Sequence, residues 1–402
     1  MKYVIIQGDG MGDFVPEPEG AATALEAART PNLDRIAGAG LFGMITTIPA
    51  DMPPGSDVGN LSLFGYDPHL YYTGRSPLEA AAMGIELGAE DVAFRMNLVT
   101  FRGEEGEEQM ADFAGGHIDS ESAAVLVGAV GEALGDQTFR FHAGVSYRHL
   151  MVWRDGAADM ETTPPHDITD QAIGPFLPRG AGADELSRIM TASRKILADH
   201  PLNRQRVSAG EPAISQIWLW GQGRRPTIPS FASKYHLRGA AISAVDLVRG
   251  IAVFAGFDNI RVPGATGFLD TDYAAKGEYA LRALEDHDLV FIHIEAPDEA
   301  GHMGDREEKI KAIEAIDEKI AGPLLERLPR LGPFKILVTS DHATPLALRT
   351  HRRDPVPFAL ATREQIAAGH TPRKYGEREA AGTGVTIETG HSIIARLLAW
   401  PE

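Results

Sequence analysis

The sequence contains no cysteine and no apolar run long enough to cross a bilayer. Without cysteine, the chain can form no disulfide and can use no thiolate as a nucleophile or a metal ligand. A transmembrane helix needs about 20 consecutive apolar residues, so we expect no membrane partner. The first residues, "MKYVIIQGDG", have too short an apolar run for a signal peptide. We interpret them as a first strand and expect a cytoplasmic protein.

Positive charge is also scarce, because 38 lysines and arginines face 56 aspartates and glutamates, for a formal net charge of -18. Proteins that bind a nucleic-acid backbone need a basic face, so we expect no nucleic acid as a partner. A small anionic ligand remains compatible with this charge if local arginines, lysines or bound metal ions attract it.

The length of 402 residues exceeds what a single core normally supports, which favours two domains. Three runs rich in β-branched residues end in polar loops that contain aspartate: "KYVIIQGDG", "LVFIHIEAPDEAGH" and "KILVTSDHATP". Such runs are typical of buried parallel strands. Amphipathic helical patterns such as "DREEKIKAIEAIDEKIAGPLLERL" lie between them. The sequence therefore predicts an α/β fold with a mostly parallel sheet flanked by helices.

The middle of the chain has a different pattern. The segments "VAFRMNLVTF" and "TFRFHAGVSYRHLMVWR" and the helical stretch between them predict a smaller α+β domain. The stretch "PFLPRGAGADEL", rich in proline and glycine, closes this domain. We therefore expect residues 92–178 to be an inserted domain, and residues 1–91 and 179–402 to form the main domain.

Polar side chains follow the predicted strands of the main domain. Taken singly, Asp9 is explained by a turn, Asp298 and His302 by a surface pair, and His391 by the start of a helix. Parallel strands end at one edge of a sheet, where carboxylates and imidazoles together need cations. Aspartate and histidine suit zinc or manganese, and hard oxygen ligands favour manganese or magnesium. The candidate ligands are Asp9, Asp298, His302, Asp341, His342 and His391.

Ser56 lies in "MPPGSDVGNLSLFGYDP", directly after Pro-Pro-Gly and at the start of a predicted helix. A serine at this position most simply caps the helix, because its oxygen accepts a hydrogen bond from a free amide of the first turn. Whether Ser56 has a further role depends on the residues that surround it in the fold.

The stretches "GDGMGD", "PPGSDVGN", "APDEAGH", "TSDHATP" and "TGHS" resemble the archaeal type of cofactor-independent phosphoglycerate mutase, in the alkaline phosphatase superfamily. The resemblance covers nearly the whole chain. It implies an alkaline-phosphatase-like fold, a small phosphorylated substrate and no need for 2,3-bisphosphoglycerate. It also implies two divalent ions, with manganese favoured over magnesium, cobalt or zinc.

Site residues follow from the same resemblance. It implies that one ion is held by Asp298, His302 and His391, and that the nucleophile is Ser56. The inserted domain would bind the glycerate and act as a lid that excludes water. The second ion would be held by Asp9, Ser56, Asp341 and His342, and the resemblance suggests substrate contacts from His117 and Arg148. Beyond the resemblance, Lys276 is a further candidate substrate contact. Arg224 and Arg225 could clamp a carboxylate or phosphate with paired hydrogen bonds, or belong to an exposed loop.

One departure from the family pattern keeps an alternative open. Members of the family often carry arginine where this chain has Gln222, and a similar bacterial branch has been proposed to act as a homoserine kinase. We therefore keep homoserine kinase, or another metal-dependent phosphotransferase or phosphatase, as a second hypothesis. The sequence has no P-loop and no kinase glycine loop, so a nucleotide would need other contacts. A metal-stabilised binding scaffold is a third hypothesis, although a scaffold needs no nucleophile.

Overall fold

The computed structural model describes residues 1–13, 21–104 and 106–401. The chain divides into two units, of which unit 1 comprises Met1–Tyr72 and Thr227–Glu402 and unit 2 comprises Thr73–Pro226. Unit 2 is thus wider than the predicted insertion 92–178. The reason is that α5 (Ser76–Ala82), α7 (Ala183–Asp199) and β9 (Gln216–Arg224), which flank that range, pack on the same small sheet.

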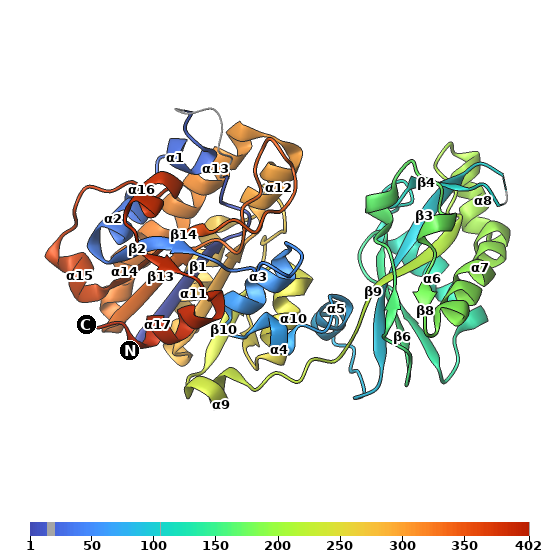
Figure 1. The fold of residues 1–402 in the computed structure, drawn as a ribbon, viewed down its shortest axis with the longest axis horizontal. Coiled ribbons are helices and arrows are strands. Elements are labelled where there is room, and N and C mark those ends of the chain that lie inside the picture. Colours follow the sequence, from blue (N-terminus) through green and yellow to red (C-terminus); the bar gives the residue numbers. More distant parts are fainter. Residues whose placement is uncertain (14–20, 105, 402) are drawn as a thin grey trace. The chain divides into compact units, whose positions relative to one another are not determined.

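Unit 1 is built on one sheet with the strand order β11-β10-β12-β1-β13-β14-β2-β15 (Figure 1). All neighbouring strands are parallel except on the two sides of β14, which runs antiparallel to both β13 and β2. This confirms the predicted mostly parallel sheet. The strands are β1 (Lys2–Gly8), β2 (Leu41–Ile45), β10 (Gly239–Ile242), β11 (Asp258–Asn259), β12 (Leu289–Ile294), β13 (Phe334–Thr339), β14 (Val356–Thr362) and β15 (Thr386–Ile387).

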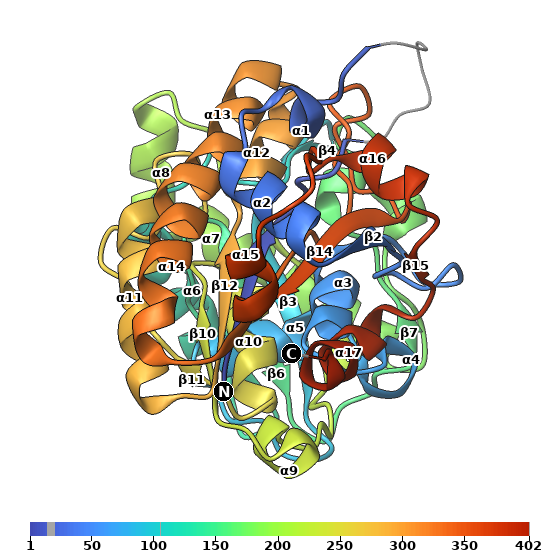
Figure 2. The same ribbon diagram turned by 90° about the vertical axis from the view of Figure 1, so that its left-hand side faces the viewer.

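Helices cover both faces of this sheet, with α13 and α14 on one side and α3 and α17 on the other (Figure 2). The strands therefore read as continuous apolar runs, because neither of their faces meets water. The helices are α1 (Ala24–Ala27), α2 (Pro31–Ala39), α3 (Ser56–Leu63), α4 (Pro68–Tyr71), α9 (Phe231–Tyr235), α10 (Asp246–Phe254), α11 (Tyr273–Asp286), α12 (Ala296–Met303), α13 (Arg306–Ile316), α14 (Gly322–Arg327), α15 (Arg363–Ala368), α16 (Glu377–Gly382) and α17 (Ile393–Ala399).

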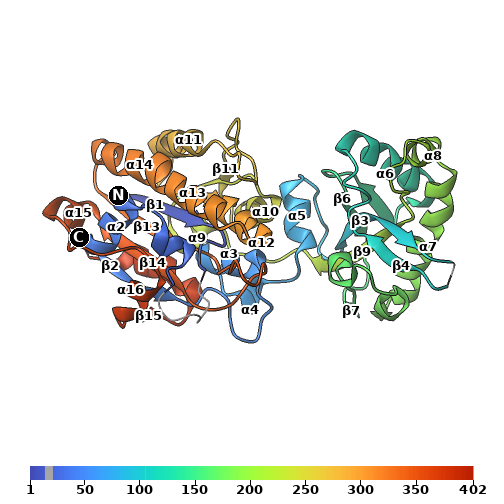
Figure 3. The ribbon, with the colours of Figure 1, turned by 90° about the horizontal axis from the view of Figure 1, so that it is seen from above.

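Unit 2 has an antiparallel sheet in which the long strand β3 pairs with β6 and β4 and also with β9. Side chains alternate along β3, so that Phe94 and Met96 join the apolar core with α6 and α7, whereas Ala93 packs with Ala80 of α5. Figure 3 shows α5 on the opposite side of this sheet from α6 and α7. The remaining elements are β3 (Val92–Arg102), β4 (Gln109–Asp112), α6 (Ser120–Leu134), β5 (Phe139–His142), β6 (Arg148–Trp153), β7 (Met160–Glu161), β8 (Arg179–Gly180) and α8 (Pro201–Ser208).

The order of the strands in unit 1 positions the polar residues. Strands β12, β1 and β13 are adjacent and parallel, so their carboxyl ends lie at the same edge of the sheet. Asp9 follows β1, Asp298 lies in the first turn of α12 directly after β12, and Asp341 and His342 follow β13. The predicted gathering of these residues at one sheet edge is confirmed.

No helix among the described residues is both long and apolar enough to span a membrane.

Candidate active site

Ser56 is the first residue of α3, as expected, but it does not cap the helix. The N-cap position is occupied by Gly55, which has no side chain to cap the helix, and Oδ1 of Asp57 accepts from the amide of Val58 at 3.0 Å. Instead, the Oγ atom of Ser56 lies 3.0 Å from Nε2 of His342, which follows β13. The half-buried hydroxyl therefore faces the polar sheet edge, next to the main-chain amides of Ser56 and Asp57 at the start of the helix.

Asp9, Asp341 and His342 form one group of buried potential ligands at this edge. The Nε2 atom of His342 lies 3.4 Å from Oδ1 of Asp9 and 3.3 Å from Oδ2 of Asp341. Asp341 accepts hydrogen bonds from the amide of Gly10 at 3.2 Å and from Nδ2 of Asn60 at 2.9 Å. The two bonds hold this carboxylate between the turn after β1 and helix α3.

Asp298, His302 and His351 lie together beside that group. The Oδ2 atom of Asp298 is 3.1 Å from Nε2 of His302 and 3.5 Å from Nε2 of His351, and the two imidazole nitrogens are 2.9 Å apart. The ring of His351 also packs against that of His342, with centroids 4.1 Å apart. Two side chains of α12 and one from the connection between β13 and β14 thus converge on one point.

His391 is not where the resemblance led us to expect it. Its Nδ1 atom lies 3.8 Å from Oδ1 of Asp67, and it belongs to no potential metal-binding group found among the described residues. The short helical turn Gly390–Ser392 packs against α3, so His391 is placed near the loop after that helix. The potential metal-binding group that includes Asp298 consists of Asp298, His342 and His351, and His302 lies 2.9 Å from His351, which stands in the connection between β13 and β14.

Burial and mutual repulsion shift the protonation of these groups. Burial and the nearby charge of Asp341 raise the pKa of Asp9 well above its ordinary value. Burial and the charge of Asp298 raise the pKa of Asp341 to about 7. Burial would also raise the pKa of Asp298, but hydrogen bonds from His302 and His351 hold it well below the usual range. The carboxylates therefore compete for too little positive charge within the protein itself.

Two observations show that this donor set suits divalent cations. The Oδ1 atoms of Asp9 and Asn60 are buried and have no hydrogen-bond partner. Buried polar atoms without partners are costly, and a cation would satisfy the carboxylate oxygen and relieve the repulsion. Imidazole nitrogens and carboxylate oxygens are also the donors that zinc, manganese and related ions accept.

Gly10 allows the turn after β1 to approach α12. Its φ of +54° lies in the left-handed region, and a Cβ atom at this position would overlap Oδ1 of Asp298 and Oγ1 of Thr344. Thr344 in turn donates a hydrogen bond to the same Oδ1 atom of Asp298. The glycine is therefore required for the two groups of ligands to lie side by side.

The predicted substrate contacts divide between the two units. His117 and Arg148 are exposed on unit 2, and both lie near Tyr147. The ring centroids of His117 and Tyr147 are 6.0 Å apart, and the guanidinium carbon of Arg148 is 5.7 Å from the ring centroid of Tyr147. In unit 1, Lys276 is fully buried and donates from Nζ to the carbonyl of His293 at 3.0 Å. That placement contradicts a direct contact between Lys276 and the substrate.

The two predicted loop arginines also differ from each other. Arg224 donates to the main-chain carbonyl of Gly156 at 2.9 Å and pairs with the carboxylate of Glu90 at 3.1 Å, so its guanidinium serves to hold unit 2 together. Arg225 is exposed. The expected clamp of two neighbouring arginines is therefore not formed, because Arg224 is committed to these contacts.

Unit 2 carries an arginine cluster that the sequence analysis did not identify. The Oε1 atom of Glu79 on α5 accepts from Nε of Arg75 at 2.9 Å and pairs with Nη1 of Arg95 at 3.1 Å. Arg95 is buried, stacks 4.7 Å from the ring centroid of Trp220, and has an Nε atom without a partner. Burial, aided by the positive charges of Arg75 and Arg148, lowers the pKa of Arg95 to about 10. Two guanidinium groups thus share one carboxylate and a third, that of Arg148, adds its positive charge, which favours an anionic ligand.

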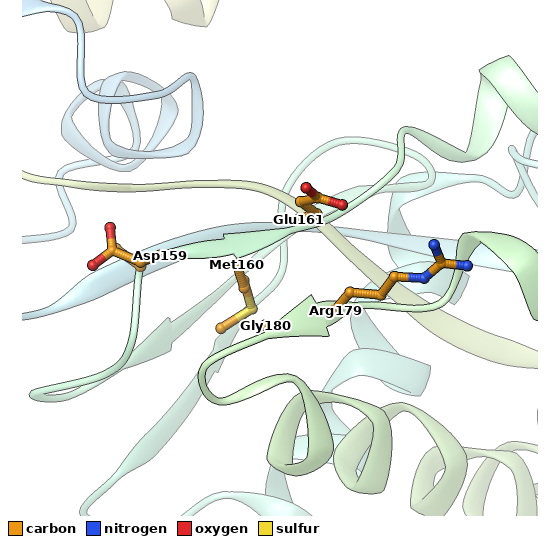
Figure 4. A pocket seen from close by; sticks show the side chains of 6 residues that line it. Asp159, Met160, Glu161, Arg179 and Gly180 are labelled. Carbon is orange, nitrogen blue, oxygen red and sulfur yellow. The ribbon is translucent and has the colours of Figure 1, made fainter.

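A separate surface pocket of about 560 Å³ lies in unit 2 between β7 and β8 (Figure 4). Glu161 and Arg179, which face each other across these two short strands, line it together with Asp159 and with Ala158, Met160 and Gly180. None of the predicted site residues lines this pocket.

Three potential ligands of unit 1 were also missed. His293 and Glu295 stand in "FIHIEAP" and form a third group with Asp9, in which the potential ligand atoms lie within 4.8 Å of one another. His293 was hidden inside an apolar strand. His351 stands in "RTHRRDP", and the aspartate and proline that follow it resemble an ordinary surface loop. Its position in the connection that leaves the carboxyl end of β13 was the available signal.

Comparison with known proteins identifies the family. The family model described as 2,3-bisphosphoglycerate-independent phosphoglycerate mutase matches residues 37–203. A mutase of this name from Methanothrix thermoacetophila is 50% identical over 99% of this chain and 100% of its own length. A probable mutase of the same kind from Geobacter sulfurreducens is 48% identical over 99% of this chain and 100% of its own length.

Solved structures agree with these relatives. A protein from Pyrococcus horikoshii is 30% identical and superposes with a TM-score of 0.79, covering 99% of this chain and 96% of its own. The cofactor-independent phosphoglycerate mutase of Thermoplasma acidophilum is 26% identical, with a TM-score of 0.65 over 99% of this chain and 98% of its own. From its sequence and its fold, the chain belongs to the family of 2,3-bisphosphoglycerate-independent phosphoglycerate mutases.

Proposed function

We propose that this protein is an isomerase that interconverts 3-phosphoglycerate and 2-phosphoglycerate through a phosphoserine at Ser56, without 2,3-bisphosphoglycerate. The observation that carries the proposal is the position of the Ser56 hydroxyl, 3.0 Å from His342 and next to the buried carboxylates of Asp9 and Asp341. The near full-length identity to relatives that bear the mutase name supports it.

Two divalent ions are part of this proposal, with manganese favoured and magnesium, cobalt or zinc as alternatives. His351 replaces His391 in the first ligand set, because His351 is the imidazole that lies beside Asp298 and His302. When bound, the ions would supply the positive charge that stabilises a phosphoryl group during transfer. The proposed sets are Asp298, His302 and His351 for one ion, and Asp9, Ser56, Asp341 and His342 for the other.

Ser56 would act as the nucleophile. Its oxygen forms a bond to phosphorus while the bond from phosphorus to the glycerate oxygen breaks, and that oxygen takes up a proton. The amides of Ser56 and Asp57 at the start of α3 are suited to bind the phosphoryl oxygens, because a helix amino terminus attracts anions. In the second step, the other hydroxyl group of the same glycerate gives up its proton and bonds to phosphorus while the bond from phosphorus to Oγ of Ser56 breaks, and Oγ regains the proton that it lost in the first step.

A mutase differs from a phosphatase because the glycerate must stay bound between the two steps. The arginine cluster of unit 2 is suited to hold the carboxylate of the glycerate, since guanidinium groups bind carboxylates with paired hydrogen bonds. Arg148, whose charge acts on this cluster, stays a proposed substrate contact, as do His117 and Arg225. The lid role of unit 2 and a cytoplasmic location stay predictions.

Gln222 does not favour the homoserine kinase alternative. Its Oε1 atom accepts a hydrogen bond from Thr162 at 2.6 Å, and its Nε2 atom donates to the carbonyl of Met160 at 2.5 Å. The side chain thus joins β9 to the neighbouring segment of unit 2. This structural role explains the glutamine, so its presence does not require a different phosphate acceptor such as homoserine.

Phosphorus NMR provides a direct test, because the two phosphoglycerates give separate signals. Purified protein should convert either isomer into the same mixture without added 2,3-bisphosphoglycerate, stop in the presence of a chelator and resume when manganese is added. Release of inorganic phosphate alone would make the protein a phosphatase. Phosphate transfer from ATP to homoserine, with no isomerisation, would favour the kinase instead.

A further inference from the structure

His293 connects Asp9 to a neighbouring strand end. It is fully buried in β12, where its Nε2 atom lies 2.7 Å from Oδ2 of Asp9 and its Nδ1 atom lies 3.0 Å from Oγ of Ser243. Ser243 directly follows β10, and Asp9 directly follows β1. Since β10 and β1 are the two neighbours of β12 in the sheet, the three side chains form a continuous line across adjacent strands.

The hydrogen bonds define which ring nitrogen carries the proton. The Ser243 hydroxyl accepts the amide of Val245 at 3.0 Å and has two possible acceptors for its own proton, the carbonyl of Val245 at 3.4 Å and Nδ1 of His293 at the shorter distance of 3.0 Å. We take the shorter contact as the one that receives the proton. Nδ1 is then an acceptor, so the imidazole proton is on Nε2 and is donated to Asp9. The opposite tautomer would place a nitrogen lone pair 2.7 Å from a carboxylate oxygen.

The two oxygens of Asp9 therefore have different roles. Oδ2 is occupied by the bond from His293, whereas Oδ1 is buried, has no hydrogen-bond partner and lies 3.4 Å from Nε2 of His342. The free oxygen is thus the one directed toward the group formed with Asp341 and His342. A carboxylate whose second oxygen is fixed in this way loses little rotational freedom when its first oxygen binds a cation.

We propose that His293 is a positioning residue that presents Oδ1 of Asp9 to a divalent cation, and that Ser243 fixes the tautomer which makes this possible. The inference rests on the proposed function only in taking Asp9 as a metal ligand. His293 acts through Asp9, and it touches neither the substrate nor the cation.

A competing role for His293 is that of a ligand. Asp9, His293 and Glu295 lie close enough together to hold a cation of their own, and Oε2 of Glu295 is 3.4 Å from Nε2 of His293. In the arrangement described above, the Nε2 atom carries a proton and has no lone pair to offer. The two roles therefore differ in the number of ions that each chain binds.

Manganese binding without substrate tests the proposal, measured by calorimetry and by the paramagnetic resonance of free manganese. The wild-type protein should bind two ions per chain. His293→Leu should weaken one of them by roughly 10- to 100-fold and leave the other unchanged. His293→Gln, whose amide can reach and donate to Asp9, should restore most of the affinity, whereas the shorter amide of His293→Asn should not. Ser243→Ala should give a smaller loss at the same ion.

His287 supplies a matched control. It is a buried histidine of the same unit, with Nε2 2.7 Å from Oδ2 of Asp258 and Nδ1 2.8 Å from the carbonyl of Ala283. It precedes β12, so it lies at the other end of that strand from Asp9. His287→Leu should leave manganese affinity unchanged. An equal loss in this variant would overturn the proposal in favour of a general effect on folding.

Two further results would overturn it. Three manganese ions in the wild-type protein and two in His293→Leu would make His293 a ligand. Unchanged manganese affinity in a folded His293→Leu would exclude any action through Asp9. If His293→Leu fails to fold, equal manganese affinities in His293→Gln and His293→Asn would likewise exclude an action of His293 through Asp9. Because binding is measured without substrate, these results stand apart from a failure of the mutase assay.

Discussion

The Oγ atom of Ser56 lies 3.0 Å from Nε2 of His342, although 286 residues of sequence separate the two. One residue begins a helix and the other follows a strand, so neither local pattern requires their contact. The sheet brings them together, because α3 begins above the carboxyl end of β13. A serine that served only as a cap would direct its oxygen toward its own helix, and Ser56 does not.

Ser56→Ala should therefore remove activity and preserve the fold. We expect kcat to fall by at least 1,000-fold, about 4 kcal/mol of barrier. The free energy of unfolding should change by less than about 1 kcal/mol, because the N-cap position belongs to Gly55. Steady-state kinetics and urea unfolding measure the two quantities. A well-folded variant that keeps more than about a tenth of the wild-type kcat would contradict the assignment of Ser56 as nucleophile.

Substitution of the two candidate histidines should separate their roles. His351→Ala should lose one of two manganese ions and nearly all turnover, because His351 lies between Asp298 and His302. His391→Ala should keep both ions, since His391 lies beside Asp67. Calorimetric titration of the two variants under the same conditions provides the measurement. Loss of an ion in His391→Ala alone would restore the ligand set that the resemblance implied.

Gly10→Ala should disturb metal binding as well as stability. The left-handed φ costs a non-glycine residue about 1 to 2 kcal/mol, and the added Cβ also displaces Asp298. Gly384→Ala is the matched control, because Gly384 has a φ of +70° and open space around it. Both variants should lose stability in urea, but only Gly10→Ala should bind manganese more weakly. Equal manganese affinities in the two would show that Asp298 adjusts without cost.

Arg148→Ala should mainly affect substrate affinity. Loss of one charged hydrogen bond to a carboxylate costs about 1.5 to 3 kcal/mol, which corresponds to roughly a 10- to 100-fold rise in KM. Its effect on kcat should be smaller if Arg148 holds the glycerate equally in the ground state and the transition state. Arg188→Ala, which removes an exposed arginine paired with Glu185 on α7, should leave KM unchanged. An unchanged KM in Arg148→Ala would argue against its contact with the substrate.

Unit 2 should lose stability in mild acid because of His149. Burial lowers the pKa of His149 to about 4, below its ordinary value of 6.5. Between these values the unfolded chain binds the proton more strongly, so stability falls as the pH falls from about 6.5 to 4, by up to about 3 kcal/mol. His149→Asn can still accept the amide of Gly144 and should remove this dependence. Urea unfolding, followed by tryptophan fluorescence at several pH values, measures the free energy of unfolding of both proteins. If His149 is not responsible, this free energy should depend on pH in His149→Asn as it does in the wild type.

Site residues that directly follow a predicted strand could be placed from the sequence, whereas those that reach the site from other parts of the chain could not. Asp9, Asp298 and Asp341 each follow an apolar run, and parallel strands bring such ends together. His351 stands before β14, whose antiparallel direction returns the chain to the same sheet edge. Nothing local distinguishes β14 from a parallel strand, so only the position of His351 in the connection after β13 could have indicated that it lies at this edge.

The boundaries of unit 2 were missed for a related reason. Its sheet includes β9, which pairs with β3 across more than 100 residues of sequence. Helix α5, expected in the main domain, packs on these two strands instead. Lys276 was misjudged because an amphipathic helix does not reveal which of its polar residues is turned inward. Its ammonium group instead supports the main chain of β12.

The order in which the chain is synthesised bears on how unit 1 assembles. Unit 2 is one continuous segment, whereas β1 finds its partners β12 and β13 only near the end of the chain. At roughly 5 to 20 residues per second, the first strand leaves the ribosome tens of seconds before those partners are translated. Unit 2 can fold during this interval, while β1, β2 and their apolar side chains wait unpaired. The nascent chain is therefore most exposed to aggregation, and most in need of a chaperone, between the synthesis of Pro226 and that of β13.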